Sequence, residues 1–358
     1  MLLAFYAPMK PPDDPVPSGD RTIARNLLKA FEAFGAEMTL ASRFRSRDGQ
    51  GDPFVQRKTL DAAEAEVERL IAMECAADWE AWVTYHSYYK APDLLGPKVS
   101  RALNIPYIQI EATRARKRLN GPWALFAQAA EAATDAARVV YYFTQRDAES
   151  LETHAPSGQH LLHLKPFLPR TELGPRSTLG GPMLSVGMMR KGDKLASYTL
   201  IAETLAALEH DDWALEIAGD GPARVEVAAL MAPFKDRIRF LGQLHPDTMQ
   251  DVYAQAKLLF WPGVNEALGM VYLEAQAAGL PIVAQDRPGM NELLGGGPHP
   301  APGTGASGLA QRLSVLLSDQ TALKDEGDTV RHRIETGHLM PAASTTLRNG
   351  LRLAGVAS

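Results

Sequence analysis

The sequence predicts an α/β fold built from two doubly wound domains, each a parallel sheet with helices on both faces. Short apolar runs alternate with amphipathic segments of helical length, and only a few residues connect one to the next. This alternation stops once, in a segment rich in proline and glycine, and then begins again. The length of 358 residues is also ordinary for two domains.

In the first domain, apolar runs typical of buried strands are separated by segments with helical periodicity. The expected strands cover residues 2–7, 37–41, 82–85, 105–110 and 139–144. The expected helices cover residues 21–34, 60–76 and 123–137, and another begins at residue 146. A loop rich in proline, residues 8–19, follows the first strand.

The segment 156–181 predicts an interdomain linker, because proline and glycine do not sustain regular structure there. Strands are then expected at 183–186, 213–218, 238–241, 258–261 and 282–284, and helices at 195–208, 223–231, 247–256 and 309–317. We therefore predict an N-terminal domain over residues 1–165, a linker over 166–182 and a C-terminal domain over 183–335. The final helix, within 336–358, is expected to return to the first domain.

Composition and charge exclude several classes of protein. The net charge of −5 gives no electrostatic reason to expect nucleic-acid binding. The single cysteine, Cys75, rules out an intrachain disulfide and a multi-cysteine zinc site, and it fits a reducing compartment. The N-terminal residues lack a basic signal region, and no apolar run approaches membrane length. We expect a cytoplasmic protein with at most peripheral membrane contact.

The most informative segment is NEALGMVYLEAQAAGLPIVAQDRPGMNELL, which begins at Asn265. Glu266 is expected in a loop, and a helix starts near Gly269 or Met270. The free N–H groups of its first turn are suited to bind a diphosphate, and Glu274, one turn further, can accept hydrogen bonds from a ribose. In isolation, two such glutamates are more often a helix-dipole partner and an exposed side chain. Their context favours the binding function.

A second candidate region is the loop VGMMRKGDK, where a strand ends in Gly187 and three cations follow: Arg190, Lys191 and Lys194. Cations beyond a strand end can neutralise a leaving diphosphate. The alternative is a solvated basic loop. The loop lacks the spacing of a Walker A motif, and the later sequence GDGP lacks the third glycine of a dinucleotide fingerprint.

Four segments in a fixed order carry a family resemblance: VGMMRKGDK, AGDGP, RIRFLGQLHPDTMQDVYAQAKLLFWPG and the glutamate segment. Together they cover residues 183–294 and resemble the retaining GT-B glycosyltransferases of family four, the glycosyl transferases group 1. The resemblance implies two Rossmann-like domains that face a central cleft. It also implies that the enzyme needs no cofactor and that its donor is a UDP-sugar or a GDP-sugar.

The resemblance assigns roles by position. Glu266 corresponds to the glutamate beside the donor sugar, and Glu274 to the one that holds the ribose. Arg190 and Lys194 correspond to the pair that binds the diphosphate, although Met188 occupies the position of the usual arginine and Lys191 competes with Arg190. The remaining candidate donor-binding positions are Gly19, Gly187, Gly219, Gly242, Leu244, Leu268, Gly269 and Met270.

In the N-terminal half, His86 follows a strand and resembles the family's histidine near the reacting sugar. A capping or core-edge histidine is the alternative. The basic run TRARKR supplies Arg114, Arg116 and Lys117 as candidate contacts to an anionic acceptor or membrane surface, or else a solvated loop. Glu111, just upstream, is either an acceptor-binding carboxylate or a structural partner of these cations.

The resemblance, together with these residues, implies one functional prediction. The protein is expected to transfer a hexosyl group from a nucleotide diphosphate sugar to an acceptor hydroxyl with retention of configuration, in polysaccharide or glycolipid biosynthesis. The acceptor is a carbohydrate, a glycolipid or a small molecule. No D-x-D pair is present, so no metal is expected on the diphosphate. Two alternatives stay open: another GT-B sugar-nucleotide enzyme of the epimerase kind, and a non-catalytic protein that binds sugar nucleotides.

Overall fold

The computed structural model describes residues 1–16, 18–266, 268–290 and 292–356, and it divides the chain into two compact units. Unit 1 consists of Met1–Lys165 together with Met340–Ser358, and unit 2 consists of Pro166–Leu339. Each unit contains a parallel sheet with helices packed on it, which confirms the predicted α/β fold.

The sheet of unit 1 is parallel throughout, with the strand order β2-β1-β3-β4-β5-β6. Its order reverses between β1 and β3, so the carboxyl ends of these two strands flank the point where open α/β sheets bind ligands. The strands are β1 (Leu2–Tyr6), β2 (Glu37–Ser42), β3 (Ala81–Ser87), β4 (Tyr107–Ala112), β5 (Val139–Tyr142) and β6 (His160–His163).

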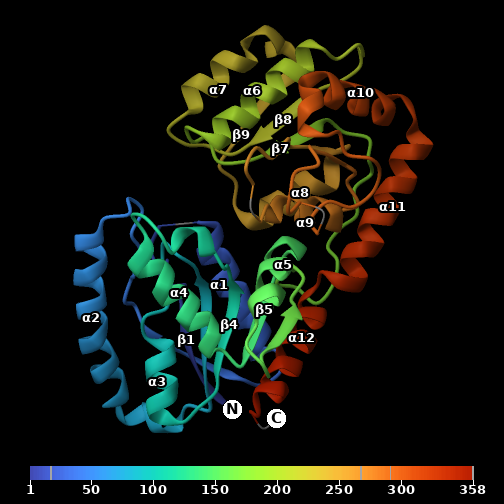
Figure 1. Ribbon diagram of the computed structural model, residues 1–358. Helices are drawn as coiled ribbons and strands as arrows, with labels where there is room; N and C mark the ends of the chain where they lie inside the picture. Colours follow the sequence, from blue (N-terminus) through green and yellow to red (C-terminus); the bar gives the residue numbers. More distant parts are fainter. Residues whose placement is uncertain (17, 267, 291, 357–358) are drawn as a thin grey trace. The chain divides into compact units, whose positions relative to one another are not determined.

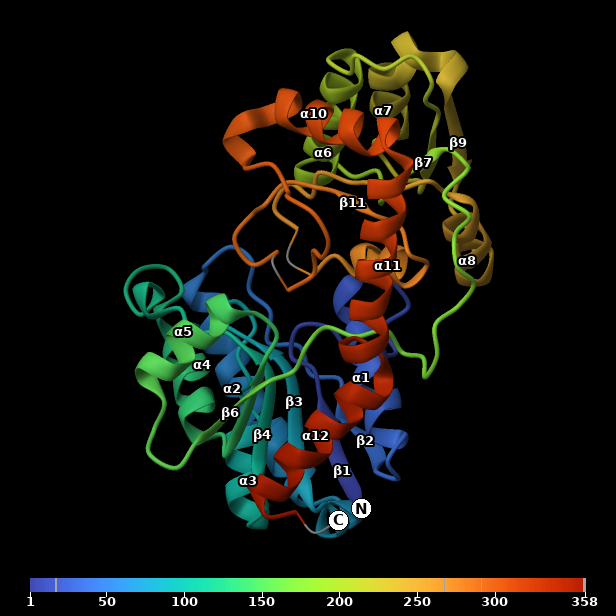
Figure 2. The ribbon, with the colours of Figure 1, turned by 90° about the vertical axis from the view of Figure 1, so that its right-hand side faces the viewer.

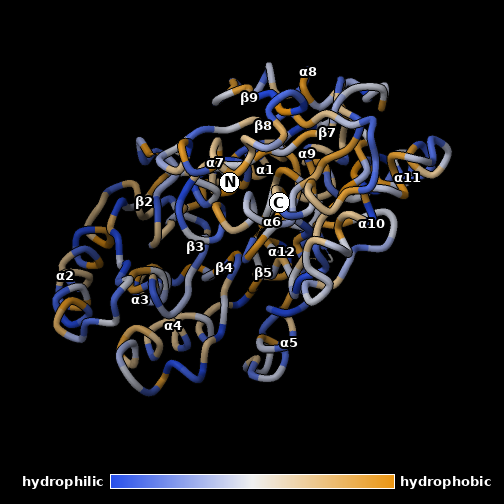
Figure 3. Tube along the Cα trace, turned by 90° about the horizontal axis from the view of Figure 1, so that it is seen from above, coloured by the Kyte–Doolittle hydropathy of each residue, from blue (hydrophilic) through white to orange (hydrophobic). Residues whose placement is uncertain are grey.

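Helices cover both faces of this sheet. Figures 1 and 2 show α2, α3 and α4 together on one face, and α1 and α12 together on the other. Hydrophilic and hydrophobic residues alternate along α2 (Figure 3), as expected for a helix that buries one side. The helices are α1 (Gly19–Glu32), α2 (Pro53–Ile71), α3 (Gly96–Leu103), α4 (Ala124–Ala136), α5 (Gln145–His154) and α12 (Met340–Ala354).

Helix α12 belongs to unit 1 although it follows unit 2 in the sequence. The hydroxyl of Ser344 donates a hydrogen bond to the carbonyl of Ala30 at the end of α1, at 2.8 Å. The hydroxyl of Tyr141 on β5 donates to the carbonyl of Leu347 at 2.7 Å. The buried residues of α12, among them Leu347 and Leu351, complete the apolar face of this unit.

The sheet of unit 2 is also parallel, with the order β11-β10-β7-β8-β9. Its order reverses between β7 and β10. The strands are β7 (Met183–Val186), β8 (Leu215–Ala218), β9 (Ile238–Gly242), β10 (Leu259–Phe260) and β11 (Ile282–Val283). Buried residues of these strands, such as Leu184, Ile217 and Phe260, form the centre of one apolar core.

The helices of unit 2 lie on both faces of its sheet. Figure 1 shows α6, α7 and α10 on one face and α8 and α9 on the other. Helix α11 packs against α9 and α10. The helices are α6 (Asp193–Ala206), α7 (Arg224–Met231), α8 (Pro246–Gln255), α9 (Met270–Ala277), α10 (Gly305–Ser318) and α11 (Gln320–Gly337).

The structure differs from the prediction in the segment expected to be a linker. Residues 160–163 form the edge strand β6 of unit 1, and residues 166–182 pack with unit 2. The amide of Ser177 donates to the carbonyl of Ala278 at 2.8 Å, and the amide of Thr178 donates to the carbonyl of Ala254 at 3.3 Å. Backbone hydrogen bonds to neighbouring elements therefore replace the regular structure that proline and glycine prevent.

Candidate functional site

The loops after β7 and β10 meet at the switch point of the sheet in unit 2. The basic loop follows β7, and Trp261 and Glu266 follow β10. Because these strands are neighbours in the sheet, the sequence segments 187–194 and 261–269 lie beside each other although they are far apart in the chain.

Lys194 and Glu266 form the centre of this cluster. The ammonium of Lys194, in the first turn of α6, lies 2.5 Å from Oε2 of Glu266. The indole N–H of Trp261 donates to the same oxygen at 3.2 Å, and Lys194 Nζ lies 5.3 Å from the centre of the Trp261 ring. Both partners of the ion pair are more than two-thirds covered, so water screens the pair only partly.

Trp261 contacts both Glu266 and Lys194 but was not predicted from the sequence, because an aromatic residue at the end of an apolar strand is usually part of the core. It is fully buried, and its ring packs edge-on against Tyr198 at 5.2 Å. A Cβ at position 187 would come within 2.6 Å of the indole, so Gly187 leaves the space that the ring fills. The predicted donor residue Gly187 thus has a packing role.

The basic loop is held by its buried member, Met189. Its amide donates to the carbonyl of Asp220, and its own carbonyl accepts from the amide of Ala223, both at 2.9 Å. The backbone of the loop after β8 approaches so closely that only glycine fits there. A Cβ at Gly219 would lie 2.0 Å from the Gly187 carbonyl oxygen, and one at Gly221 would lie 2.5 Å from that of Met189.

Three further side chains of the basic loop, those of Met188, Arg190 and Lys191, form no described contact with Glu266. Lys191 is exposed, with Nζ 3.9 Å from Oε1 of Glu226 on α7. Met188, at the position of the family's arginine, is 38% exposed. Arg190 is exposed and forms no ion pair with any described residue. Lys194 is thus the cation of this loop that contacts Glu266.

Helix α9 begins beside this cluster. Gly269 is its N-cap and provides no side-chain hydrogen bond to the first turn. A Cβ at Gly269 would approach the Tyr272 ring at 2.6 Å and Glu266 Cγ at 2.9 Å, so glycine is required for this close packing. Leu268 and Met270 flank it and pack on the core of unit 2. The N-terminus of α9 and the Glu266 side chain therefore lie together.

Glu274 lies one turn into α9 and already has a partner within unit 2. The hydroxyl of Tyr253 on α8 donates to Glu274 Oε2 at 2.9 Å. Burial raises the pKa of the Glu274 carboxyl, while the Tyr253 hydrogen bond and the charge of Arg170 oppose this rise. Neither Tyr253 nor Arg170 was selected from the sequence, since only the folded chain brings them to Glu274.

The other two predicted donor positions lie at the end of β9. Gly242 has a φ of 69°, and its carbonyl accepts the amide of Gly219 at 2.8 Å. Glycine adopts this left-handed conformation without steric cost. Leu244 is partly buried against the core of unit 2.

A second cluster lies at the switch point of unit 1 and contains His86. Its Nδ1 lies 2.8 Å from Oδ1 of Asp20 in the first turn of α1, and 3.8 Å from Oε2 of Glu111 at the end of β4. The Tyr88 ring stacks on the imidazole at 5.0 Å. His86 and Glu111 have φ values of 58° and 60°. Such left-handed conformations cost energy for these residue types and often occur at functional sites.

The electrostatics of this cluster favour a charged histidine. Burial disfavours the imidazolium, but the charge of Glu111 and the hydrogen bond to Asp20 outweigh it and raise the pKa of His86 to about 9. Burial also raises the pKa of Glu111, and the charge on His86 opposes that rise. Gly19 begins α1 directly before Asp20, and a Cβ there would meet nothing within 4 Å.

We expect the charge on His86 to stabilise unit 1 in a pH-dependent manner. Its pKa of about 9 in the fold exceeds the value of roughly 6.5 for an unfolded chain. The stabilisation is therefore complete below about pH 6.5 and is lost as the pH rises through 9. His86→Asn keeps a residue that tolerates positive φ but cannot titrate.

Chemical denaturation at several pH values checks this expectation. Wild type should lose stability relative to His86→Asn between pH 6.5 and 9, and NMR titration of His86 should give a midpoint near 9. The groups that face this histidine are Asp20, Glu111, Asp147 and Tyr88. Lys29 lies in the last turn of α1 and is not one of them, so Lys29→Gln is a suitable control. A midpoint near the unfolded value would contradict the assigned contacts.

The basic run divides into a buried and an exposed part. Arg114 is almost fully buried and pairs with Glu131 and Asp135 of α4, each at 2.6 Å, which favours a structural role over the predicted contact with an acceptor. Arg116 and Lys117 are exposed. Glu111 faces His86 instead of serving as a partner of these cations.

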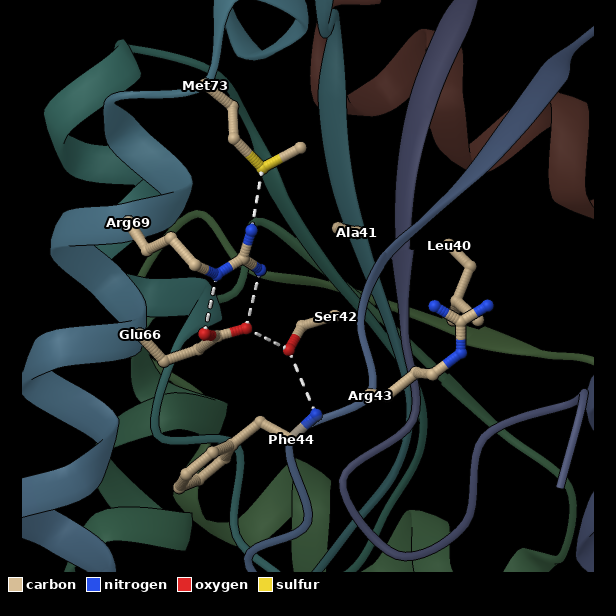
Figure 4. Close-up of a pocket in the computed structure, with 8 residues that line it drawn as sticks. All are labelled: Leu40, Ala41, Ser42, Arg43, Phe44, Glu66, Arg69 and Met73. Carbon is tan, nitrogen blue, oxygen red and sulfur yellow. Dashed lines mark hydrogen bonds and ion pairs between the residues drawn. The ribbon is translucent and has the colours of Figure 1, made fainter.

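A separate pocket of about 470 Å³ lies beside the end of β2 in unit 1 (Figure 4). Its polar groups largely bind one another. Arg69 donates to both carboxylate oxygens of Glu66, at 2.7 and 2.8 Å, and the Ser42 hydroxyl donates to Glu66 at 2.5 Å. The Ser42 oxygen in turn accepts the amide of Phe44 at 3.0 Å. This leaves few polar groups free to select a ligand.

The described part of the chain offers neither a candidate metal cluster nor a helix suited to span a membrane. In residues 1–16, 18–266, 268–290 and 292–356, no group of three or more His, Cys, Asp or Glu side chains is arranged to hold a metal ion. None of the helices described there combines the length and the apolar character needed to cross a bilayer.

The architecture defines the fold class: the chain has the GT-B fold that solved glycosyltransferases share. Residues 183–319 match the family model described as Glycosyl transferases group 1. A sucrose-phosphate synthase from Thermosynechococcus elongatus superposes over all of both chains, with a TM-score of 0.71 and 16% identity. At this identity, the likeness shows the fold alone.

Two curated proteins are similar in sequence to part of the chain. One is a GDP-mannose-dependent monoacylated alpha-(1-6)-phosphatidylinositol monomannoside mannosyltransferase of Corynebacterium glutamicum, 29% identical over 202 residues, covering 51% of each chain. The other is an exopolysaccharide phosphotransferase of Streptomyces coelicolor, 31% identical over 166 residues, covering 43% of this chain and 17% of that protein. The chain thus spans about half or less of the length of these relatives.

The role of Trp261 at this site can be tested by Trp261→Phe, which removes the hydrogen bond to Glu266 and weakens the contact with Lys194. We expect kcat to fall about fivefold with little change in KM, since the loss of one such bond is worth about 1 kcal/mol. Trp213→Phe, which changes another largely buried tryptophan of unit 2, serves as the control. Equal kinetics for both variants would assign Trp261 to the core alone.

Proposed function

We propose that the protein is a retaining GT-B glycosyltransferase that moves a hexosyl group from a nucleotide diphosphate sugar to an acceptor hydroxyl. The observation that carries this proposal is the convergence of Lys194, Glu266 and the N-terminus of α9 at the switch point of unit 2. A cation and helix N–H groups suit a diphosphate, and the adjacent carboxylate suits sugar hydroxyls. The match of residues 183–319 to a glycosyltransferase family supports the same activity.

In this proposal, unit 2 binds the donor. Lys194, with Arg190 on the same loop, stabilises the charge that develops on the leaving diphosphate, and Leu268, Gly269 and Met270 offer backbone N–H groups. Glu266 accepts hydrogen bonds from the sugar. The bond between the anomeric carbon and the phosphate oxygen breaks as the acceptor oxygen bonds to that carbon. The acceptor proton passes to the departing phosphate, so the reaction needs neither a metal nor a strong protein base.

Unit 1 is proposed to bind the acceptor and to supply His86, held as an imidazolium by Asp20, as a hydrogen-bond donor to a substrate oxygen. Arg116 and Lys117 are exposed cations suited to an anionic acceptor or to the headgroups of a membrane surface. The name of the Corynebacterium relative specifies GDP-mannose and a glycolipid, which places a GDP-sugar and a lipid-linked acceptor among the first compounds to test. We propose that the protein acts in the cytoplasm.

The test uses a panel of UDP- and GDP-sugars, incubated with the full chain in the presence and absence of a lipid extract and of simple sugar acceptors. We expect nucleotide release that depends on the acceptor, and a product whose anomeric configuration by NMR equals that of the donor. Release of a modified sugar without dependence on an acceptor would favour an epimerase-like enzyme. Binding of a nucleotide in thermal-shift assays without turnover would favour a non-catalytic binding protein, and no binding at all would reject the proposal.

A further inference from the structure

The segment between β11 and α10 packs on a buried ion pair of unit 2. Arg312 of α10 donates to Oε2 of Glu326 on α11, and each side chain is only 9% exposed. The backbone of the segment lies directly against this pair. A Cβ at Gly296 would come within 2.7 Å of Glu326 Cγ, and one at Gly297 within 2.6 Å of Arg312 Nη2. Glycine permits this approach, so close packing on the ion pair holds the segment in place.

His299 lies on the same segment, near the ion pair. Both of its ring nitrogens are buried, and neither forms a hydrogen bond with any described residue. The same is true of Nε of Arg312 and of Oε1 of Glu326. The charged groups that face the imidazole are Arg312, Glu326 and Asp286, together with the carbonyl of Gly295. His299 is thus a covered titratable group that the proposed reaction does not use.

This environment disfavours a proton on the imidazole. Burial and the charge of Arg312 lower the pKa of His299, and the charges of Glu326 and Asp286 offset this only in part. If the segment opens, His299 reaches water and regains its ordinary affinity for a proton. Below the ordinary pKa of 6.5, the open segment therefore binds a proton that the closed segment resists. Acid favours the open form, and this effect is lost as the pH rises above 6.5.

Two hydrogen bonds connect the segment to the residues that follow β11. The amide of Asp286 donates to the carbonyl of Pro300, directly after His299, at 2.9 Å. The side-chain amide of Gln285 donates to the carbonyl of Pro302 at 3.4 Å. Gln285 is only 1% exposed, so its position depends on these neighbours. An opening of the segment breaks both bonds.

Gln285 also connects the segment to the switch-point site. Its backbone amide donates to the carbonyl of Pro262 at 3.3 Å, and Pro262 directly follows Trp261 in the chain. We propose that protonation of His299 opens the segment 295–302 and releases Gln285, so that acid weakens nucleotide binding at the switch point of unit 2. The effect on nucleotide binding rests on the proposed function, whereas the opening itself does not.

Hydrogen exchange of the full chain, followed by mass spectrometry at about pH 5 and about pH 8, tests the opening. After correction for the intrinsic pH dependence of exchange, we expect the amides of Gln285 and Asp286 to exchange about threefold or more faster in acid. In His299→Gln, which cannot titrate, the corrected rates should agree. His332→Gln is the matched control, because it removes an exposed histidine of α11 and should keep the acid effect.

Equal corrected rates at both pH values in wild type overturn the inference, as does an acid effect that persists in folded His299→Gln. A second measurement needs no variant. NMR titration of His299 in wild type should give a midpoint below the ordinary value of 6.5, and a midpoint at or above this value overturns the inference.

Isothermal titration calorimetry with UDP and GDP tests the link to the site. Between about pH 8 and about pH 5, wild type and His332→Gln should lose about threefold more affinity than His299→Gln for the nucleotide that binds. Equal losses in wild type and His299→Gln overturn the link to the site. If neither nucleotide binds at either pH, the proposed function fails, and the exchange rates alone decide whether His299 opens the segment.

Discussion

Glu266→Gln is expected to lower kcat for sugar transfer by about 100-fold or more while the fold stays intact. Glutamine keeps the shape of the side chain but removes the charge that Lys194 and the Trp261 indole now contact. Loss of one preorganised electrostatic contact at a reaction centre typically costs two to three orders of magnitude in rate. Steady-state kinetics with the active donor measures kcat and KM separately.

The matched control is Glu226→Gln, which removes the charge of an exposed glutamate that lies 3.9 Å from Lys191 on the outer side of the same basic loop. This variant should retain kcat within about twofold, because exposed ion pairs contribute little. If Glu266→Gln turned over at a rate within threefold of wild type, Glu266 would have no part in the chemistry. A lower melting temperature in both variants would instead report on loop stability.

Gly219→Ala is expected to destabilise unit 2 by about 3 kcal/mol or more and to abolish donor binding. Gly219 has a φ of 139°, and its new Cβ would lie 2.0 Å from the carbonyl oxygen of Gly187, a backbone atom that cannot rotate away. Strained backbone conformations cost on the order of 1–3 kcal/mol, and the clash adds to that cost. Relief of the clash would shift the loop that carries Lys194.

Denaturant titration followed by two probes separates the unfolding of unit 2 from that of unit 1. The control is Gly303→Ala, where a Cβ would meet nothing within 4 Å and φ is not positive. We expect Gly303→Ala to change the free energy of unfolding by less than about 1 kcal/mol. A comparably small effect of Gly219→Ala would contradict the close approach of the two loops.

The fold was predictable because parallel strands buried on both faces appear in sequence as short apolar runs. The observed strands in both units lie within two residues of the predicted ranges, except β6, which was not predicted. Helix α2 begins at Pro53, earlier than predicted, because Asp52 caps it and proline fits its first turn. The predicted start at residue 60 was based on the alternating charges of the helix and not on the Asp52-Pro53 pair that starts it. Edge strand β6 is short, and only its pairing with β5 defines it.

The candidate site could be predicted in part. Glu266 and Lys194 were selected by type and position, and the structure places them in contact. Their partner Trp261 was not predicted. In the sequence, a tryptophan that contacts a site looks the same as one that only fills the core. Arg114 and Arg116 look equivalent within TRARKR. Only the positions of Glu131 and Asp135 on α4 separate the buried structural arginine from the exposed one.

The return of α12 to unit 1 has a consequence for the order in which the chain folds during synthesis. The packing of unit 1 requires residues from 340 onward. The Ser344 hydroxyl donates a hydrogen bond to Ala30 of α1, and the Leu347 carbonyl accepts one from Tyr141 of β5. Unit 2, by contrast, is complete once residue 339 has left the ribosome. Residues 1–165 are therefore synthesised before unit 2 but complete their packing after it, because one apolar face stays uncovered until α12 has been synthesised.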